Sequence, residues 1–170
     1  MPIIQTLAAA VGAWKSMYSD SKVLPTIVTS IHLGSLLVAG GLALSADRAT
    51  IRSAQKDDAE RRRHLTALGA THRPVLIALT VLFLSGLALT AADLETFLAS
   101  PVYWIKGGVI VLLLINGLWM TRTEGALRAS PNATIDVVSR RWRALRLAAL
   151  SSLVLWMTTL VLGVALVNAA

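Results

Sequence analysis

The sequence predicts an all-α, polytopic membrane protein built as a four-transmembrane-helix bundle. Hydrophobic residues make up 55% of the 170 residues and charged residues only 15%, which is too apolar for a small soluble domain. Four apolar stretches each approach the ~20 residues that a helix needs to cross a ~30 Å hydrocarbon core. These predicted spans cover about residues 23–46, 74–92, 102–121 and 145–167.

The positive charges gather in two of the connections between the spans. The first and third connections are rich in Arg and Lys, whereas the second carries only Asp93 and Glu95. Because cytoplasmic loops carry an excess of Lys and Arg, we expect a multi-pass protein of the bacterial cytoplasmic (inner) membrane with both termini outside. The net charge of +7 then faces anionic headgroups of the lipid bilayer, and no nucleic acid partner is expected.

Residues 1–22 are predicted to form an amphipathic interfacial helix, apart from the bundle at 23–170. Ile3, Leu7, Val11, Trp14 and Tyr18 recur at helical spacing and form one apolar stripe. Trp and Tyr favour membrane interfaces, so we expect Trp14 and Tyr18 at headgroup level on the outer surface. A frayed terminus is the alternative.

The connections carry the remaining signals. The run "AQKDDAERRRH", which includes His64, is interpreted as solvated. Gly69 is expected to interrupt the helix that precedes it, and Pro74 to occupy the first helical position of the second span. This places His72 at the cytoplasmic interface. The short link "DLETFLASP" predicts antiparallel neighbours, and Asn116 is expected to form a hydrogen bond between helices.

Two ionisable side chains, His32 and Lys106, fall inside the predicted spans and are therefore functional candidates. At 1.5 Å per residue, His32 lies ~12 Å and Lys106 ~6 Å inward from the outer end of its span. His72 enters from the opposite surface, so we do not expect His32 and His72 to hold one haem together. No carboxylate falls inside the four spans.

A single histidine embedded in the membrane suits a haem b as its cofactor. A neutral imidazole is an ordinary axial ligand of haem iron, which makes His32 the candidate metal ligand. Ser35 shares the mostly small face of His32, and Trp156 needs a flat surface or a partner for its N–H. Lys106 is a candidate partner for a haem propionate.

Simpler interpretations of the same residues exist. His32 is also suited to a hydrogen bond with a neighbouring helix, and Lys106 to reaching the outer headgroups with its ammonium group. The chain has no cysteine, which excludes thiolate metal sites, iron–sulfur clusters and covalently attached haem.

Three segments carry a resemblance to known proteins: "IHLGSLLVAGGLALSADR", "RPVLIALTVLFLSGLAL" and "YWIKGGVIVLLLINGL". Over about residues 25–120 the chain resembles the bacterial four-helix membrane superfamily of CopD-like domains and HemJ-type protoporphyrinogen oxidases. The resemblance implies a b-type haem with a functional histidine and lysine, which match His32 and Lys106. The N-terminal helix, the outside termini and the longer first connection depart from the HemJ-type pattern.

We therefore expect a haem b protein that transfers electrons between a membrane carrier such as quinone and a partner protein. No catalytic residue is assigned. A second axial ligand would come from His72, from a second copy in a homodimer, or from another subunit of a membrane complex. The alternative function is a non-catalytic accessory or anchor subunit of a larger membrane complex.

Overall fold

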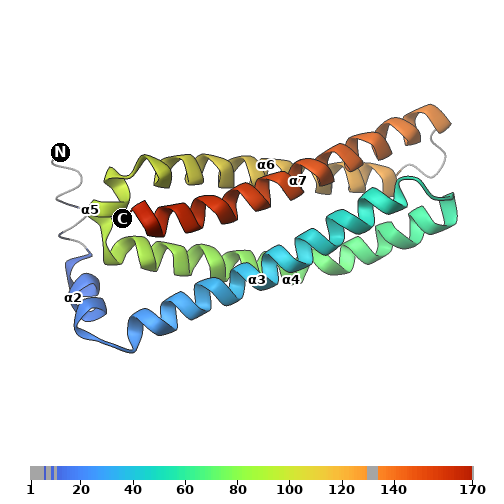
Figure 1. Cartoon of the computed structure of the whole chain (residues 1–170). Coiled ribbons are helices and arrows are strands. Elements are labelled where there is room, and N and C mark those ends of the chain that lie inside the picture. Colours follow the sequence, from blue (N-terminus) through green and yellow to red (C-terminus); the bar gives the residue numbers. More distant parts are fainter. Residues whose placement is uncertain (1–5, 7–8, 10, 130–133, 170) are drawn as a thin grey trace.

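The chain folds into a bundle of long helices (Figure 1), described here from a computed structural model for residues 6, 9, 11–129 and 134–169. Within those residues, four helices are long and apolar enough to cross a membrane, which confirms the predicted fold class. These helices are α3 (Leu24–Ser53), α4 (Asp58–Ala92), α6 (Pro101–Arg128) and α7 (Ile135–Ala169). Two short helices, α2 (Gly12–Asp20) and α5 (Leu94–Ala99), accompany them.

The long helices form two antiparallel hairpins. Helix α3 packs against α4, α6 packs against α7, and the hairpins meet mainly where α3 contacts α7. Helices α2 and α5 and the last turns of α7 lie at the same end of the bundle (Figure 1). We call this the terminal end. The opposite end, where the two Arg-rich connections lie, is called the basic end.

All four long helices continue beyond the predicted spans at the basic end, and α4 and α7 continue furthest. Helix α4 begins at Asp58, where the Asp57 side chain caps it by accepting a hydrogen bond from the Glu60 backbone N–H at 2.8 Å. Both Gly69 and Pro74 lie inside this helix, so the prediction of an interruption at Gly69 is wrong. A glycine inside a helix costs only about 1 kcal/mol relative to alanine, which packing against α3 offsets.

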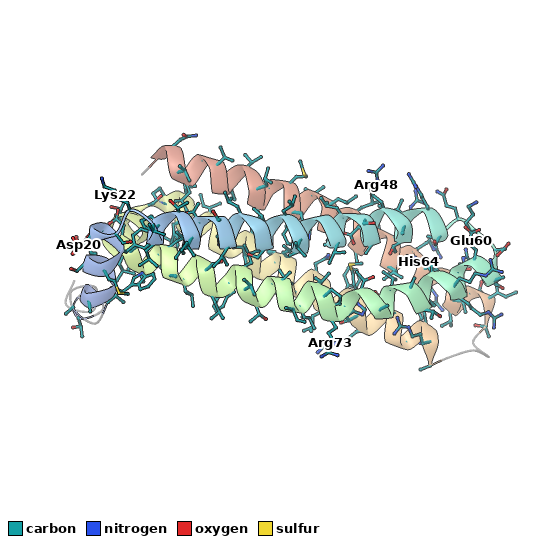
Figure 2. The ribbon with its side chains drawn as sticks, turned by 90° about the horizontal axis from the view of Figure 1, so that it is seen from below. Asp20, Lys22, Arg48, Glu60, His64 and Arg73 are labelled. Atoms are coloured by element: carbon teal, nitrogen blue, oxygen red, sulfur yellow. The ribbon has the colours of Figure 1, made fainter. Side chains whose placement is uncertain are left out.

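The resulting helices exceed the thickness of a bilayer. With 35 residues each, α4 and α7 are about 52 Å long at 1.5 Å per residue. The hydrocarbon core is ~30 Å thick, and ~40–45 Å with the headgroups included. Figure 2 shows that Glu60 and His64 lie near one tip of the bundle, with Asp20 and Lys22 at the other. With their axes along the membrane normal, α4 and α7 would therefore extend beyond the headgroups.

Helix α2 docks on the terminal end of the bundle. The Trp14 indole N–H donates a hydrogen bond to the Ala88 carbonyl of α4 at 2.9 Å, and the ring of Tyr18 lies 5.9 Å from that of Trp14. The predicted stripe extends to Ile3 and Leu7, which fall outside the described residues. The hydrogen bond of Trp14 is therefore made to the bundle, and it holds α2 against α4.

Candidate functional site

His32 lies on α3 and faces α4 in the terminal half of the bundle. Its Nδ1 is 3.0 Å from Ser85 Oγ, and the carbonyl of Leu82 lies beside the same ring. Gly86 allows this close approach, because a Cβ at that position would sit 3.3 Å from His32 Cε1. The Nδ1–Cε1 edge of the imidazole is therefore held against one turn of α4.

The hydrogen bonds of Ser85 identify the tautomer of His32. Ser85 Oγ lies 2.8 Å from the Val81 carbonyl and 3.0 Å from the Leu82 carbonyl, both of which accept its single proton. Ser85 Oγ must then accept from His32 Nδ1–H. In the neutral ring this leaves the lone pair on Nε2, the nitrogen that is available to a metal.

Lys106 approaches this site from α6. It lies close enough to His32 for an electrostatic interaction, and its Nζ is 3.4 Å from the position of a Cβ on Gly163 of α7. Glycine at 163 thus leaves room for the ammonium group. Lys106 is only half-buried and has no hydrogen bond or ion pair with the residues that the structure describes.

Ser35 and Trp156 have structural contacts of their own. The Ser35 hydroxyl donates to the carbonyl of His32 at 3.0 Å, within the same helix. Trp156 is 6% exposed, and its ring packs against Gly40, where a Cβ would be 3.6 Å from Trp156 Cε3. Since Gly40 is two turns along α3 from His32, Trp156 packs α7 against α3 deeper in the bundle.

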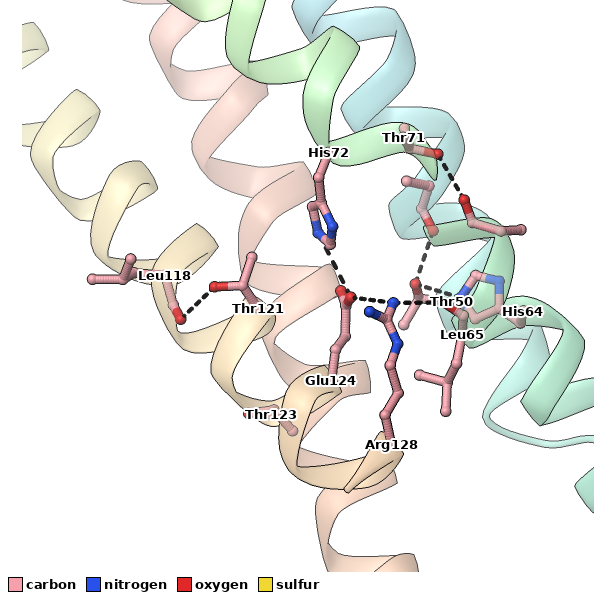
Figure 3. Close-up of polar contacts among 12 residues, drawn as sticks. Thr50, His64, Leu65, Thr71, His72, Leu118, Thr121, Thr123, Glu124 and Arg128 are labelled. Atoms are coloured by element: carbon pink, nitrogen blue, oxygen red, sulfur yellow. Dashed lines mark hydrogen bonds and ion pairs between the residues drawn. The ribbon is translucent and has the colours of Figure 1, made fainter. Parts of the chain in front are cut away.

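His72 lies in a separate polar cluster toward the basic end (Figure 3). Its Nε2 is 3.6 Å from Glu124 Oε2 on α6. Along α4, His72 is about 20 Å from Ser85 at 1.5 Å per residue, and Ser85 is the contact of His32. The structure therefore brings His32 and Lys106 together and leaves His72 apart from them.

Glu124 is the centre of this second cluster. It is 2% exposed and also lies 3.4 Å from Arg128 Nη2, which donates to the Leu65 carbonyl of α4 at 2.6 Å. Gly69 makes room for the guanidinium, since a Cβ there would be 3.3 Å from Nη2. Buried ions require such pairing, and here the pairing links α4 to α6.

Two more polar groups at this end are buried. His64, which the sequence suggested was solvated, is 9% exposed, and its Nε2 lies 2.8 Å from Thr50 Oγ1. Asp47 is 3% exposed and faces Ser152 of α7. The expectation of a solvated His64 is therefore wrong, because α3 and α4 continue as a packed pair past the predicted span ends.

The sequence carried a signal for Glu124. Asn116, Met120, Glu124 and Arg128 recur every four residues, so they share one face of α6. Three of them are buried, and Asn116 Nδ2 donates to the Ala148 carbonyl of α7 at 2.9 Å, which confirms the hydrogen bond predicted for Asn116. Extending the stripe past the end of the apolar run would have found Glu124.

Within the described residues, no group of three or more His, Asp or Glu side chains could hold a metal ion. No protein-family model, curated protein or solved structure matches the chain. In the described part of the terminal half, the His32 imidazole nitrogen and the nearby Lys106 ammonium group are the groups that this site offers to a ligand.

Proposed function

We propose that this chain is a haem b-binding protein of the bacterial cytoplasmic membrane that transfers electrons between a quinone and a partner protein. His32 Nε2 would bind the iron, and Lys106 would pair with a propionate. The observation that carries the proposal is the Nδ1 hydrogen bond to Ser85, because it fixes the ring and leaves Nε2 as a metal-binding nitrogen. The resemblance to CopD-like and HemJ-type proteins supports the same pair.

The donor set fits this cofactor. A b-type haem can be held by one neutral imidazole, without a carboxylate or thiolate ligand from the protein. Its propionates are anions, which suit a lysine without a protein partner. Bound haem would supply a one-electron ferric–ferrous couple. The chain itself orients the imidazole through Ser85, and Gly86 and Gly163 let the imidazole and the Lys106 ammonium group approach α4 and α7 closely.

The geometry also limits the source of a second axial ligand. His72 pairs with Glu124 of α6 and lies about 20 Å along α4 from Ser85, the contact of His32. It therefore does not share an iron with His32. A six-coordinate centre would take its other ligand from a second copy of the chain or from another subunit. A five-coordinate centre would need neither.

Absorption spectra of the detergent-purified protein, with and without dithionite, test the cofactor. We expect a Soret band that is lost in His32→Ala and retained in His72→Ala, since only His32 presents a free nitrogen at the site. External imidazole added to His32→Gly would restore the band. A colourless, folded wild-type protein, with helix content by circular dichroism unchanged, would support the accessory-subunit function instead.

The proposed orientation is tested separately. The chain has no cysteine, so single-cysteine variants report the accessibility of one position each. We expect Asn168→Cys at the terminal end to react with an impermeant maleimide in intact cells, and Gln55→Cys in the first basic connection to react only after permeabilisation. The reverse pattern would place both termini in the cytoplasm.

A further inference from the structure

The outer face of the α6–α7 hairpin carries two grooves that meet at one residue. The first, about 640 Å³ in volume, is lined mostly by apolar side chains, among them Leu112, Ile115 and Val154. The second, about 510 Å³, is lined by Arg122, Arg140 and Arg141 among others. Trp119 lines both grooves, so they form one continuous surface that changes from apolar to basic.

The arginines of the second groove have no acidic partners. None of the three forms an ion pair with the described residues, and no carboxylate lines the groove. Arg141 is oriented by a hydrogen bond from Nη1 to the Ala126 carbonyl at 2.7 Å. Arg122 and Arg140 are exposed. Three guanidinium groups beside one groove form a site of strong positive potential that suits an anion.

Trp119 lies between the apolar and the basic groove, where the boundary between hydrocarbon and headgroups is expected. Its side chain is 49% exposed, and tryptophan is enriched at the boundary between hydrocarbon and headgroups. The two grooves extend from Leu112 to Ala126, which is about 21 Å at 1.5 Å per residue. Half of a bilayer with its headgroups is about 20–22 Å thick, so the surface matches one leaflet in length.

We propose that this surface is a binding site for one anionic phospholipid. The acyl chain lies along Leu112, Ile115 and Val154, and the phosphate lies among Arg122, Arg140 and Arg141. Basic pockets between helices at the cytoplasmic side bind anionic headgroups, and the apolar groove adds contact that a free phosphate lacks. This site is independent of His32 and of haem.

Quenching of Trp119 fluorescence tests the proposal. The protein is reconstituted in phosphatidylcholine nanodiscs with increasing fractions of phosphatidylglycerol whose acyl chains are brominated. The Trp119 component is obtained by subtracting the quenching of Trp119→Phe, since four other tryptophans remain. We expect quenching to saturate at a low fraction of brominated phosphatidylglycerol, and to need a much larger fraction of brominated phosphatidylcholine.

The arginine variants separate a site from general surface charge. An arginine near an anionic lipid contributes about 1 kcal/mol, or roughly fivefold in affinity. Arg122→Gln/Arg140→Gln should therefore weaken the preference for phosphatidylglycerol by roughly 25-fold. Arg62→Gln/Arg63→Gln removes the same charge from exposed positions on α4 and should leave the preference unchanged.

Three results would overturn the proposal. Equal quenching by the two brominated lipids would show a groove without headgroup selectivity. An equal loss in both double variants would assign the preference to diffuse surface charge. A dimer in lipid-free detergent, with Trp119 shielded from a soluble quencher, would assign the groove to a second copy of the chain. Circular dichroism of each variant verifies that the helices are intact.

Discussion

The buried clusters in the two halves of the bundle differ in composition. At the basic end the core contains large side chains, including Leu65, Trp142 and Leu145, and arginines lie outside it. In the terminal half the buried cluster is Ala39, Ala78 and Trp156. Large apolar side chains point outward there instead, with Leu37 76% exposed and Phe83 63% exposed.

Leu65 and Trp142 lie outside the predicted spans, and outside the hydrocarbon the burial of large apolar side chains drives packing. Lipid is as apolar as leucine, so helices in a membrane associate through close packing of small residues and through polar contacts. The His32–Ser85 contact belongs to the second kind of core. The change from one kind of core to the other occurs within continuous helices rather than at their ends.

Truncating a large buried side chain should separate the two halves most strongly. Leu145 is fully buried in the basic-end core, so Leu145→Ala should lower the free energy of unfolding by about 3 kcal/mol. The matched change Leu37→Ala, on the outward face of α3, should cost less than about 0.5 kcal/mol. Unfolding by SDS titration in mixed micelles measures both, and equal losses would contradict the division.

Enlarging a small residue should damage the terminal half. A Cβ at Gly40 would lie 3.6 Å from the ring of Trp156, whereas a Cβ at Gly41 would have nothing within 4 Å. Gly40→Leu should therefore reduce the free energy of unfolding by about 2 kcal/mol through overpacking. Gly41→Leu, tested in the same micelles, should have little effect. If Gly41→Leu were the more harmful change, Trp156 would not be the contact between α3 and α7.

Removing a buried hydrogen bond at the basic end should have the smallest effect. Thr50 Oγ1 donates to the Ala46 carbonyl at 2.9 Å and accepts from His64 Nε2–H. Thr50→Val leaves that N–H without its acceptor and should cost about 1 kcal/mol. Thr80→Val, at an exposed threonine whose hydroxyl bonds only to its own helix, is the control. Equal stability of the two variants would mean that His64 finds another acceptor.

Most of the fold could be predicted from the sequence, because four apolar runs of membrane length specify four helices. Their ends could not. Arg and Asp residues after residue 46 and before residue 74 suggested solvated chain, yet Asp47 and His64 are buried there. A hydropathy run marks where lipid ends, whereas a helix ends where its tertiary packing ends. In the sequence, that packing shows only as a stripe of residues at helical spacing that continues through the charged segment.

The candidate site was predicted in part. His32 and Lys106 stand out as ionisable residues in apolar runs, and the structure places them near each other. Ser85 could not be predicted as the partner of His32, because the register between α3 and α4 depends on side-chain packing along both helices. Glu124 was overlooked since it follows the third apolar run by only a few residues.

The length of α4 and α7 determines the distance at which soluble proteins meet this chain. Each helix exceeds the full ~40–45 Å bilayer by about 10 Å when counted at 1.5 Å per residue over 35 residues. If that excess length lies at the basic end, a macromolecule approaching from the aqueous side would touch a folded, arginine-bearing stem before it touched lipid. Such a stem can be recognised by shape as well as by charge, which a flexible loop of the same composition could not offer.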